Sequence, residues 1–332
     1  MSNGTGTNTL PQLLTLIITT SPIPSAPSTD LLQAALDSFR LHCDSLLDIN
    51  VIVVFDAHEQ VTSTARLKKG YVTEKGIQDY EKYKENCRQL FLSAYGQTPE
   101  PAFTQCRGEA EFGSPNSTTP VPYSAASTEN GRVTFIDVEE RRLGFGLAVR
   151  TALRMVTTPY VWVHQHDWAL LQPVPVASII SVMQYAETQD QLPIKYICLP
   201  SVRGLSYATS NKVTKFPELK KLTDTLTRDY TSPDDPSVSI PLTPMYFWHD
   251  RPHIVLTEHY LQRVFPTRLA MLRGAFIEDT IGQRARNQMK EGQWEKWATW
   301  IYNPGGGTQA CLRHLQGRTR AEQGKPTEDS IP

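Results

Sequence analysis

The stretch RRLGFGLAVRTALRMVTTPYVWVHQHDW, residues 141–168, decides the fold. Its first part, LGFGLAVRTALRMV, has apolar residues at helical spacing, and YVWVHQ after it has the short apolar run of a strand. That strand ends in His164, Gln165, His166 and Asp167. A buried strand that ends in imidazole and carboxylate groups indicates a site at the point where the chain leaves the core.

The segments on either side repeat this alternation of strand and helix. LLTLIITT (13–20) and NVIVVFDAHE (50–59) have the apolar, β-branched composition of strands, and TDLLQAALDSFRLHC (29–43) between them has helical spacing. The segment 50–59 is apolar nearly throughout, which is typical of a strand covered on both faces. GRVTFIDVEE predicts a further strand at 132–138. The order predicts an α/β fold with a mostly parallel central sheet flanked by helices.

Residues 60–130 interrupt the alternation. TEKGIQDYEKYKENCRQLFLSAY (73–95) predicts a charged amphipathic helix. Residues 97–131 are rich in Pro, Ser, Thr and Gly without periodicity, and they predict a long surface loop.

Composition limits the classes of function. A net charge of −1 over 332 residues gives no case for nucleic acid or a charged membrane surface as a partner. No apolar run approaches the ~20 residues of a membrane-spanning helix, and the first residues lack the basic segment of a signal peptide. The five cysteines are widely spaced without a C-x-x-C pair, which is typical of reduced thiols. We therefore expect a soluble, cytoplasmic protein.

Polar residues follow three of the predicted strands. TTSPIP follows the first strand, Asp56 the second, and HQHD the strand at 160–165. Ligands gather at the carboxyl ends of parallel strands, and imidazole with carboxylate suits a divalent ion. The His-x-His-x-Asp-His pattern of metallo-β-lactamase-like hydrolases fails, because Trp168 follows Asp167. The simpler alternatives are a turn role for Asp56 and a histidine pair hydrogen-bonded within the core.

The segments IITTSPIP, VIVVFDAHE and RRLGFGLAVRTALRMVTTPYVWVHQHDW together resemble the GT-A glycosyltransferases, particularly family-2-like enzymes. The resemblance covers residues 12–200 well and extends more loosely to 318. It implies one GT-A-type domain over 1–318, with a nucleotide-binding half at 12–170 and an acceptor half at 171–318. Residues 319–332 are polar and predicted to be disordered.

The resemblance also implies a donor, a UDP- or dTDP-linked sugar, and an acceptor that the sequence does not identify. The residues that it assigns to the nucleotide sugar are Thr20, Ser21, Asp56, Arg150, Gln165, His166, Asp167 and Arg318. It assigns a divalent cation, Mn²⁺ or Mg²⁺, to Asp167, His166 and His314. The family's motif at this strand end is acidic, whereas HQHD keeps only Asp167, so metal binding is expected to be weaker or absent. A basic residue such as Arg318 could then neutralise the leaving diphosphate.

Two segments of the second half carry further candidates. In GAFIEDTIGQ, Glu278 and Asp279 resemble the acidic pair that supplies the general base of inverting GT-A enzymes, with Asp279 the closer match. The alternative is an acidic pair that complements a helix dipole. In PMYFWHDRPHIVLTEHYL, Trp248, Asp250 and His253 are acceptor candidates, and the alternative is a packed core with satisfied polar groups.

The predicted function is transfer of a sugar to an acceptor hydroxyl with inversion. A sugar-nucleotidyltransferase is an alternative, but it would require a Gly-rich, basic phosphate loop that TTSPIP does not provide. A non-catalytic protein on a decayed transferase scaffold is another, because HQHD lacks the family's acidic residues.

Overall fold

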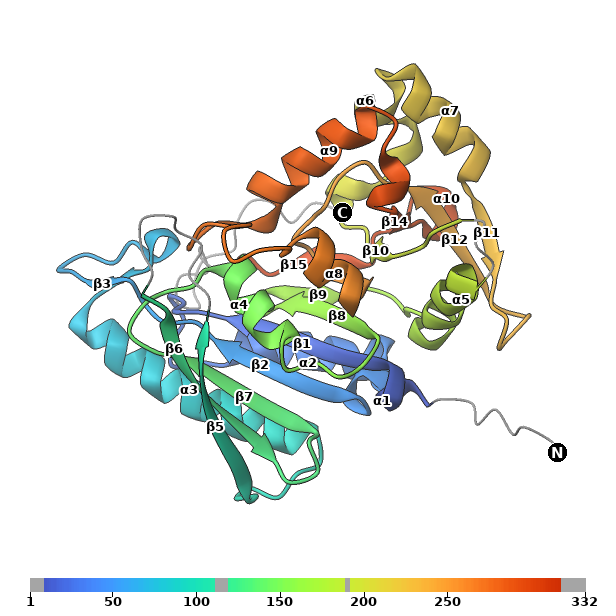
Figure 1. Cartoon of the computed structure of the whole chain (residues 1–332). Coiled ribbons are helices and arrows are strands. Elements are labelled where there is room, and N and C mark those ends of the chain that lie inside the picture. Colours follow the sequence, from blue (N-terminus) through green and yellow to red (C-terminus); the bar gives the residue numbers. More distant parts are fainter. Residues whose placement is uncertain (1–8, 111–118, 189–191, 318–332) are drawn as a thin grey trace.

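The computed structural model describes residues 9–110, 119–188 and 192–317, and its centre is one eleven-stranded sheet (Figure 1). The strand order across the sheet is β11-β12-β14-β10-β13-β8-β1-β2-β7-β6-β5. The strand bounds are β1 Leu14–Thr20, β2 Asn50–Phe55, β5 Phe103–Ala110, β6 Val121–Thr128, β7 Val133–Val138, β8 Tyr160–Gln165, β10 Tyr196–Cys198, β11 Arg228–Thr231, β12 Ser239–Pro244, β13 His253–Leu256 and β14 Thr299–Tyr302.

The centre of this sheet is parallel. β8, β1, β2 and β7 are parallel neighbours. Following the pairings outward, β5, β10, β11 and β14 run in the same direction, and β6, β12 and β13 run in the opposite one. Eight of the eleven strands of this sheet therefore share one direction. The predicted α/β fold with a mostly parallel central sheet is confirmed.

Helices and two small sheets complete the structure. α4 packs on β1 and β2, α3 on β7, and α5 and α7 on β12. The helix bounds are α1 Leu10–Leu13, α2 Asp30–His42, α3 Glu74–Ala94, α4 Phe145–Leu153, α5 Val176–Thr188, α6 Asn211–Thr214, α7 Pro217–Leu226, α8 Thr257–Arg263, α9 Gln283–Lys290 and α10 Pro304–Gly307. The small sheets pair β3 Gln60–Val61 with β4 Tyr71–Val72, and β9 Trp168–Leu170 with β15 Leu312–His314. Within the residues that the structure describes, every helix is too short or too polar to span a lipid bilayer.

The long surface loop predicted over 97–131 is wrong. This segment contains β5 and β6, which pair antiparallel and extend the sheet beyond β7. The strand pattern was hidden because β5 is an edge strand with most of its side chains in solvent. An edge strand whose two faces are both exposed to solvent does not need alternating apolar and polar residues, so hydrophobic periodicity cannot reveal it.

Asp56, which follows β2, holds the start of α4 against the end of that strand. Its carboxylate accepts hydrogen bonds from the backbone N–H of Leu143 at 2.7 Å and of Gly144 at 2.8 Å. Gly144 has φ +81°, and a Cβ there would lie 2.5 Å from the Cα of Gly274, so the turn requires glycine. Burial raises the pKa of Asp56 to about 6, although these N–H donors act in the opposite direction. Asp56 thus holds the turn that precedes α4.

Replacing Asp56 with Ala would leave the N–H groups of Leu143 and Gly144 buried without their acceptor. We expect a loss of about 2–4 kcal/mol in the free energy of unfolding, measured by urea denaturation. Because the pKa is raised in the folded state, the contribution of Asp56 is greatest below its ordinary pKa and falls as the pH rises through about 6. The loss should therefore be larger at pH 4.5 than at pH 7. Asp48→Ala, at an exposed position, is the control, and an equal loss at both pH values would contradict the account.

Candidate functional site

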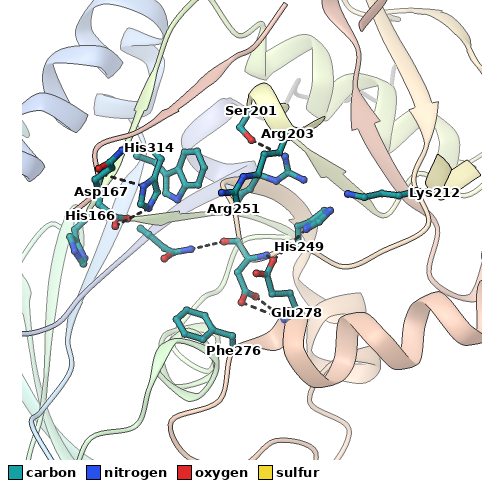
Figure 2. Close-up of a pocket in the computed structure, with 14 residues that line it drawn as sticks. His166, Asp167, Ser201, Arg203, Lys212, His249, Arg251, Phe276, Glu278 and His314 are labelled. Atoms are coloured by element: carbon teal, nitrogen blue, oxygen red, sulfur yellow. Dashed lines mark hydrogen bonds and ion pairs between the residues drawn. The ribbon is translucent and has the colours of Figure 1, made fainter. Parts of the chain in front are cut away.

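A cavity of about 490 Å³ opens at the carboxyl end of β8 (Figure 2). We call it the main cavity. Predicted site residues from distant parts of the sequence meet in its lining, namely Gln165, His166, Asp167, Asp250, Glu278 and His314. The remaining lining residues are Trp168, Ser201, Arg203, Lys212, His249, Arg251, Phe276 and Gln316. Figure 2 shows His166, Asp167 and His314 at one end of this cavity and Lys212 at the other.

His164 belongs to the core and stabilises the turn that follows β8. It is fully buried, the indole N–H of Trp162 donates to its Nδ1 at 3.3 Å, and its Nε2 lies 3.0 Å from the carbonyl oxygen of Trp168. The ring is therefore the tautomer that donates from Nε2. Burial lowers the pKa of His164 to about 4, which keeps the imidazole neutral. The simpler interpretation of a core histidine holds for His164, whereas residues 165–167 line the main cavity.

The C-terminal segment crosses this edge of the site. β15 pairs with β9 so that His314 lies opposite Trp168, and the His314 Nε2 lies 3.2 Å from the Asp167 Oδ2. A Cβ on Gly317 would lie 2.9 Å from the Cβ of Asp167, so the backbone there passes directly over the strand end. Arg318, predicted to contact the diphosphate, lies outside the described residues, as does the predicted disordered tail 319–332.

The predicted metal ligands lie at one end of the main cavity (Figure 2). Asp167 lies beside His314, and the Nδ1 of His166 lies 3.3 Å from the carbonyl oxygen of Thr19, a backbone contact that metal-ligating histidines also make. In the described parts of the chain, no group of three or more His, Cys, Asp or Glu side chains could hold a metal ion. As they are arranged here, these side chains do not form a divalent-cation site by themselves.

The pKa values of two carboxyl groups in the main cavity are shifted in opposite directions. The backbone N–H of Glu278 lies 3.3 Å from the Oδ1 of Asp250, and the Glu278 Oε2 lies 3.3 Å from the Nδ1 of His249. Burial, followed by the charge of Glu278, raises the pKa of Asp250 well above its ordinary value. The hydrogen bond from His249 lowers the pKa of Glu278, and burial lowers that of His249. The pKa values of Asp250 and Glu278 are thus shifted in opposite directions beside a neutral imidazole, a separation that acid–base sites use.

Sequence reasoning missed the basic wall of the main cavity, formed by Arg203, Lys212 and Arg251. Arg251 is buried, and its Nη1 donates to the Ser201 Oγ at 3.0 Å. Arg203 lies in a short turn, Val202–Gly204, just beyond the carboxyl end of β10. Arg203 could have been found from the sequence, because ligands gather beyond the carboxyl ends of parallel strands and Arg203 follows the predicted strand IKYICLPSV.

Other predicted donor residues lie in packed positions. The Thr20 hydroxyl lies 2.9 Å from that of Tyr83, and Ser21 follows it, half-buried, after β1. Arg150 is buried in α4, with its guanidinium 5.6 Å from the ring centre of Phe265. Thr20, Ser21, Asp56 and Arg150 are not among the lining residues of the main cavity.

The predicted site residues of the second half of the chain also fall into two groups, those that are packed away from the main cavity and those that line it. Trp248 and His253 have no exposed surface, and their rings are 6.2 Å apart in a cluster of aromatic side chains. They occupy the core, as the alternative for this segment held. Asp279 is exposed and does not line the main cavity, whereas its neighbour Glu278 does.

Comparison with known proteins shows only distant likenesses. No protein-family model and no curated protein sequence matches the chain. Among solved structures, S. aureus TarS has 9% identity and a TM-score of 0.42, over 90% of this chain and 36% of that one. GalNAc-T7 with UDP, GalNAc and Mn²⁺ has 10% identity and a TM-score of 0.42, over 96% of this chain and 46% of that one.

A third likeness is to glucosyl-3-phosphoglycerate synthase from Mycobacterium tuberculosis in complex with Mn²⁺, UDP and glucosyl-3-phosphoglycerate. It has 14% identity and a TM-score of 0.29, over 76% of this chain and 59% of that one. The chain thus spans less than two thirds of each of these proteins. Likenesses this distant assign no activity to this chain.

The raised pKa of Asp250 favours the protonated acid, which can be tested by substitution. Asn has the shape of a protonated Asp and keeps an oxygen acceptor for the backbone N–H of Glu278. We therefore expect Asp250→Asn to change the free energy of unfolding by less than about 1 kcal/mol, while Asp250→Ala loses about 1–3 kcal/mol. Urea denaturation at pH 7 measures both. If the Asn variant is as unstable as the Ala variant, Asp250 is ionised in the folded protein.

Proposed function

We propose that this protein is a glycosyltransferase. It moves a sugar from a nucleotide-diphosphate donor, UDP- or dTDP-linked, to an acceptor hydroxyl with inversion. The observation that carries the proposal is the composition of the main cavity, in which the ionised Glu278 faces cationic side chains at the carboxyl end of a parallel strand. The proposal divides the chain at this cavity, with the donor held mainly by residues 12–170 and the acceptor by residues 171–318.

The donor end of the main cavity is the one formed by Gln165, His166 and Asp167. The ribose and diphosphate of a nucleotide sugar need hydrogen-bond partners there, and the leaving diphosphate needs positive charge. Arg251 supplies that charge, because it is buried and its guanidinium is held by Ser201. A planar guanidinium binds phosphate oxygens in pairs, which suits a diphosphate.

The acceptor reacts beside Glu278. Its hydroxyl oxygen attacks the anomeric carbon, the bond from that carbon to the diphosphate oxygen breaks, and the nucleoside diphosphate leaves with the electron pair. The Glu278 carboxylate takes the hydroxyl proton, and His249 holds the carboxylate in place. The exposure of Asp279 moves our proposal for the base from Asp279 to Glu278.

Substitution of the two acidic residues separates these assignments. Glu278→Gln keeps the size and the contact with His249 but cannot accept the proton, so turnover should fall by ~10²–10⁴-fold while UDP affinity stays unchanged. Asp279→Asn should retain most of the turnover, and Glu291→Gln, at an exposed position, is the control. The readout is release of the nucleoside diphosphate from a panel of UDP- and dTDP-sugars. Loss of turnover in Asp279→Asn alone would return the role of base to Asp279.

The donor end has its own test. Asp167→Asn keeps the size but replaces a carboxylate, a strong acceptor for the ribose hydroxyl groups, with a weaker amide acceptor, so UDP affinity and turnover should fall together. We expect the same result in EDTA, because Arg251 supplies positive charge to the diphosphate. The control is Arg313→Gln, which removes an exposed charge from the neighbouring β15.

The outcomes of this donor test also separate the alternatives. Turnover that EDTA abolishes and Mn²⁺ restores would mean that a divalent cation neutralises the diphosphate. Release of pyrophosphate would indicate a nucleotidyltransferase. Binding of sugar nucleotides without turnover would indicate a non-catalytic protein on a transferase scaffold.

A further inference from the structure

A second cavity of about 150 Å³ adjoins the main cavity. We call it the side cavity, and it shares Lys212 and His249 with the main one. Its other lining residues are Tyr207, Tyr246, Phe247, Gln283 and Arg286. We propose that the side cavity binds a phosphate group of the acceptor, so that the acceptor is a phosphorylated sugar or polyol. This inference rests on the proposed function and specifies the acceptor that it leaves open.

The first support is unbalanced positive charge. Within the described residues, neither Lys212 nor Arg286 forms a salt bridge with a carboxylate. Burial lowers the pKa of Lys212, and the charges of Arg251 and Arg286 lower it further, while Glu278 acts in the opposite sense. These cations therefore lie close enough to repel one another, with Lys212 exposed at the rim of the side cavity and Arg286 half-buried. An anion bound between them would relieve that repulsion.

The second support is the rigidity of the walls. The hydroxyl of Tyr207 accepts the backbone N–H of Tyr246 at 2.9 Å, and the hydroxyl of Tyr246 donates to the carbonyl of Leu219 at 2.8 Å. A Cβ on Gly282 would lie 2.7 Å from the carbonyl oxygen of Trp248, so the helical segment that carries Arg286 packs tightly on this wall. Fixed walls hold the cationic side chains near the bound group at little entropic cost.

The third support is the position of the side cavity relative to the proposed base. His249 lines both cavities and contacts the carboxylate of Glu278 at 3.3 Å. A phosphate held by Lys212 and Arg286 would therefore place the hydroxyl groups of the same small molecule near Glu278. The donor diphosphate is the competing occupant, but Asp167 lies at the opposite end of the main cavity from Lys212 (Figure 2).

The test measures binding of two probes to the full chain by calorimetry. The first probe is UDP alone, and the second is glycerol 1-phosphate added to protein saturated with UDP, with glycerol as the uncharged comparison. We expect glycerol 1-phosphate to bind and glycerol not to. Lys212→Gln and Arg286→Gln should each weaken glycerol 1-phosphate binding by about tenfold or more, and Arg286→Gln, which lies outside the main cavity, should leave UDP affinity unchanged. Lys215→Gln, which removes an exposed charge just after α6, should change neither.

Three results would overturn the inference, and they are distinguishable from failure of the proposed function. The phosphate subsite is rejected, and the transferase proposal stays intact, if UDP binds but glycerol 1-phosphate binds neither the free nor the UDP-saturated protein. The same holds if glycerol 1-phosphate binds equally well to the Lys212 and Arg286 variants. If UDP displaces glycerol 1-phosphate, these cations belong to the donor diphosphate. By contrast, phosphate binding as expected, without turnover of any sugar nucleotide, would leave the anion site and reject the transferase.

Discussion

The pairing of β8 with both of its neighbours is the constraint on which the site depends. β8 runs parallel to β1 and antiparallel to β13, with Val163 opposite His253. Because β13 runs in the opposite direction, the residues that precede it lie beside the residues that follow Val163. The side-chain amide of Gln165 accordingly donates to the carbonyl oxygen of Asp250 at 2.9 Å. This register brings the two halves of the sequence to one edge of the sheet, where the main cavity forms.

Much of this could be predicted from the sequence. The apolar runs at β1, β2 and β8 are buried strands in the parallel centre of the sheet, because a strand covered on both faces must be apolar throughout. Parallel strands gather their carboxyl ends at one edge, so Gln165, His166 and Asp167 were recognisable as candidates. The closeness of His314 to Asp167 followed only from the family resemblance, since β9 ends at Leu170 and its partner β15 begins only at Leu312.

The remainder depends on tertiary packing that no local pattern records. Residues 244–261 contain aromatic and polar side chains in alternation, and the sequence alone cannot show which ones face the cavity. In the structure Trp248 and His253 are buried in the core, while His249 and Arg251 line the main cavity. The same limit applies to Glu278 and Asp279, because adjacent residues on a helical turn point in different directions. The pKa values of the site carboxyl groups are a second property that the sequence does not show. Those of Asp250 and Glu278 are shifted in opposite directions by burial and by neighbouring groups, which depend on the fold.

The central claim is that the edge formed by β8 and β13 binds a nucleotide-diphosphate sugar, with Asp167 on the donor side and Glu278 facing the acceptor. A crystal structure of the protein with UDP bound tests it most directly. The account predicts that the diphosphate lies in the main cavity within hydrogen-bonding distance of the Arg251 guanidinium, with the ribose beside Asp167 and the Glu278 carboxylate left free for the acceptor. UDP bound outside this cavity, or with its diphosphate in the side cavity against Lys212 and Arg286, would contradict it.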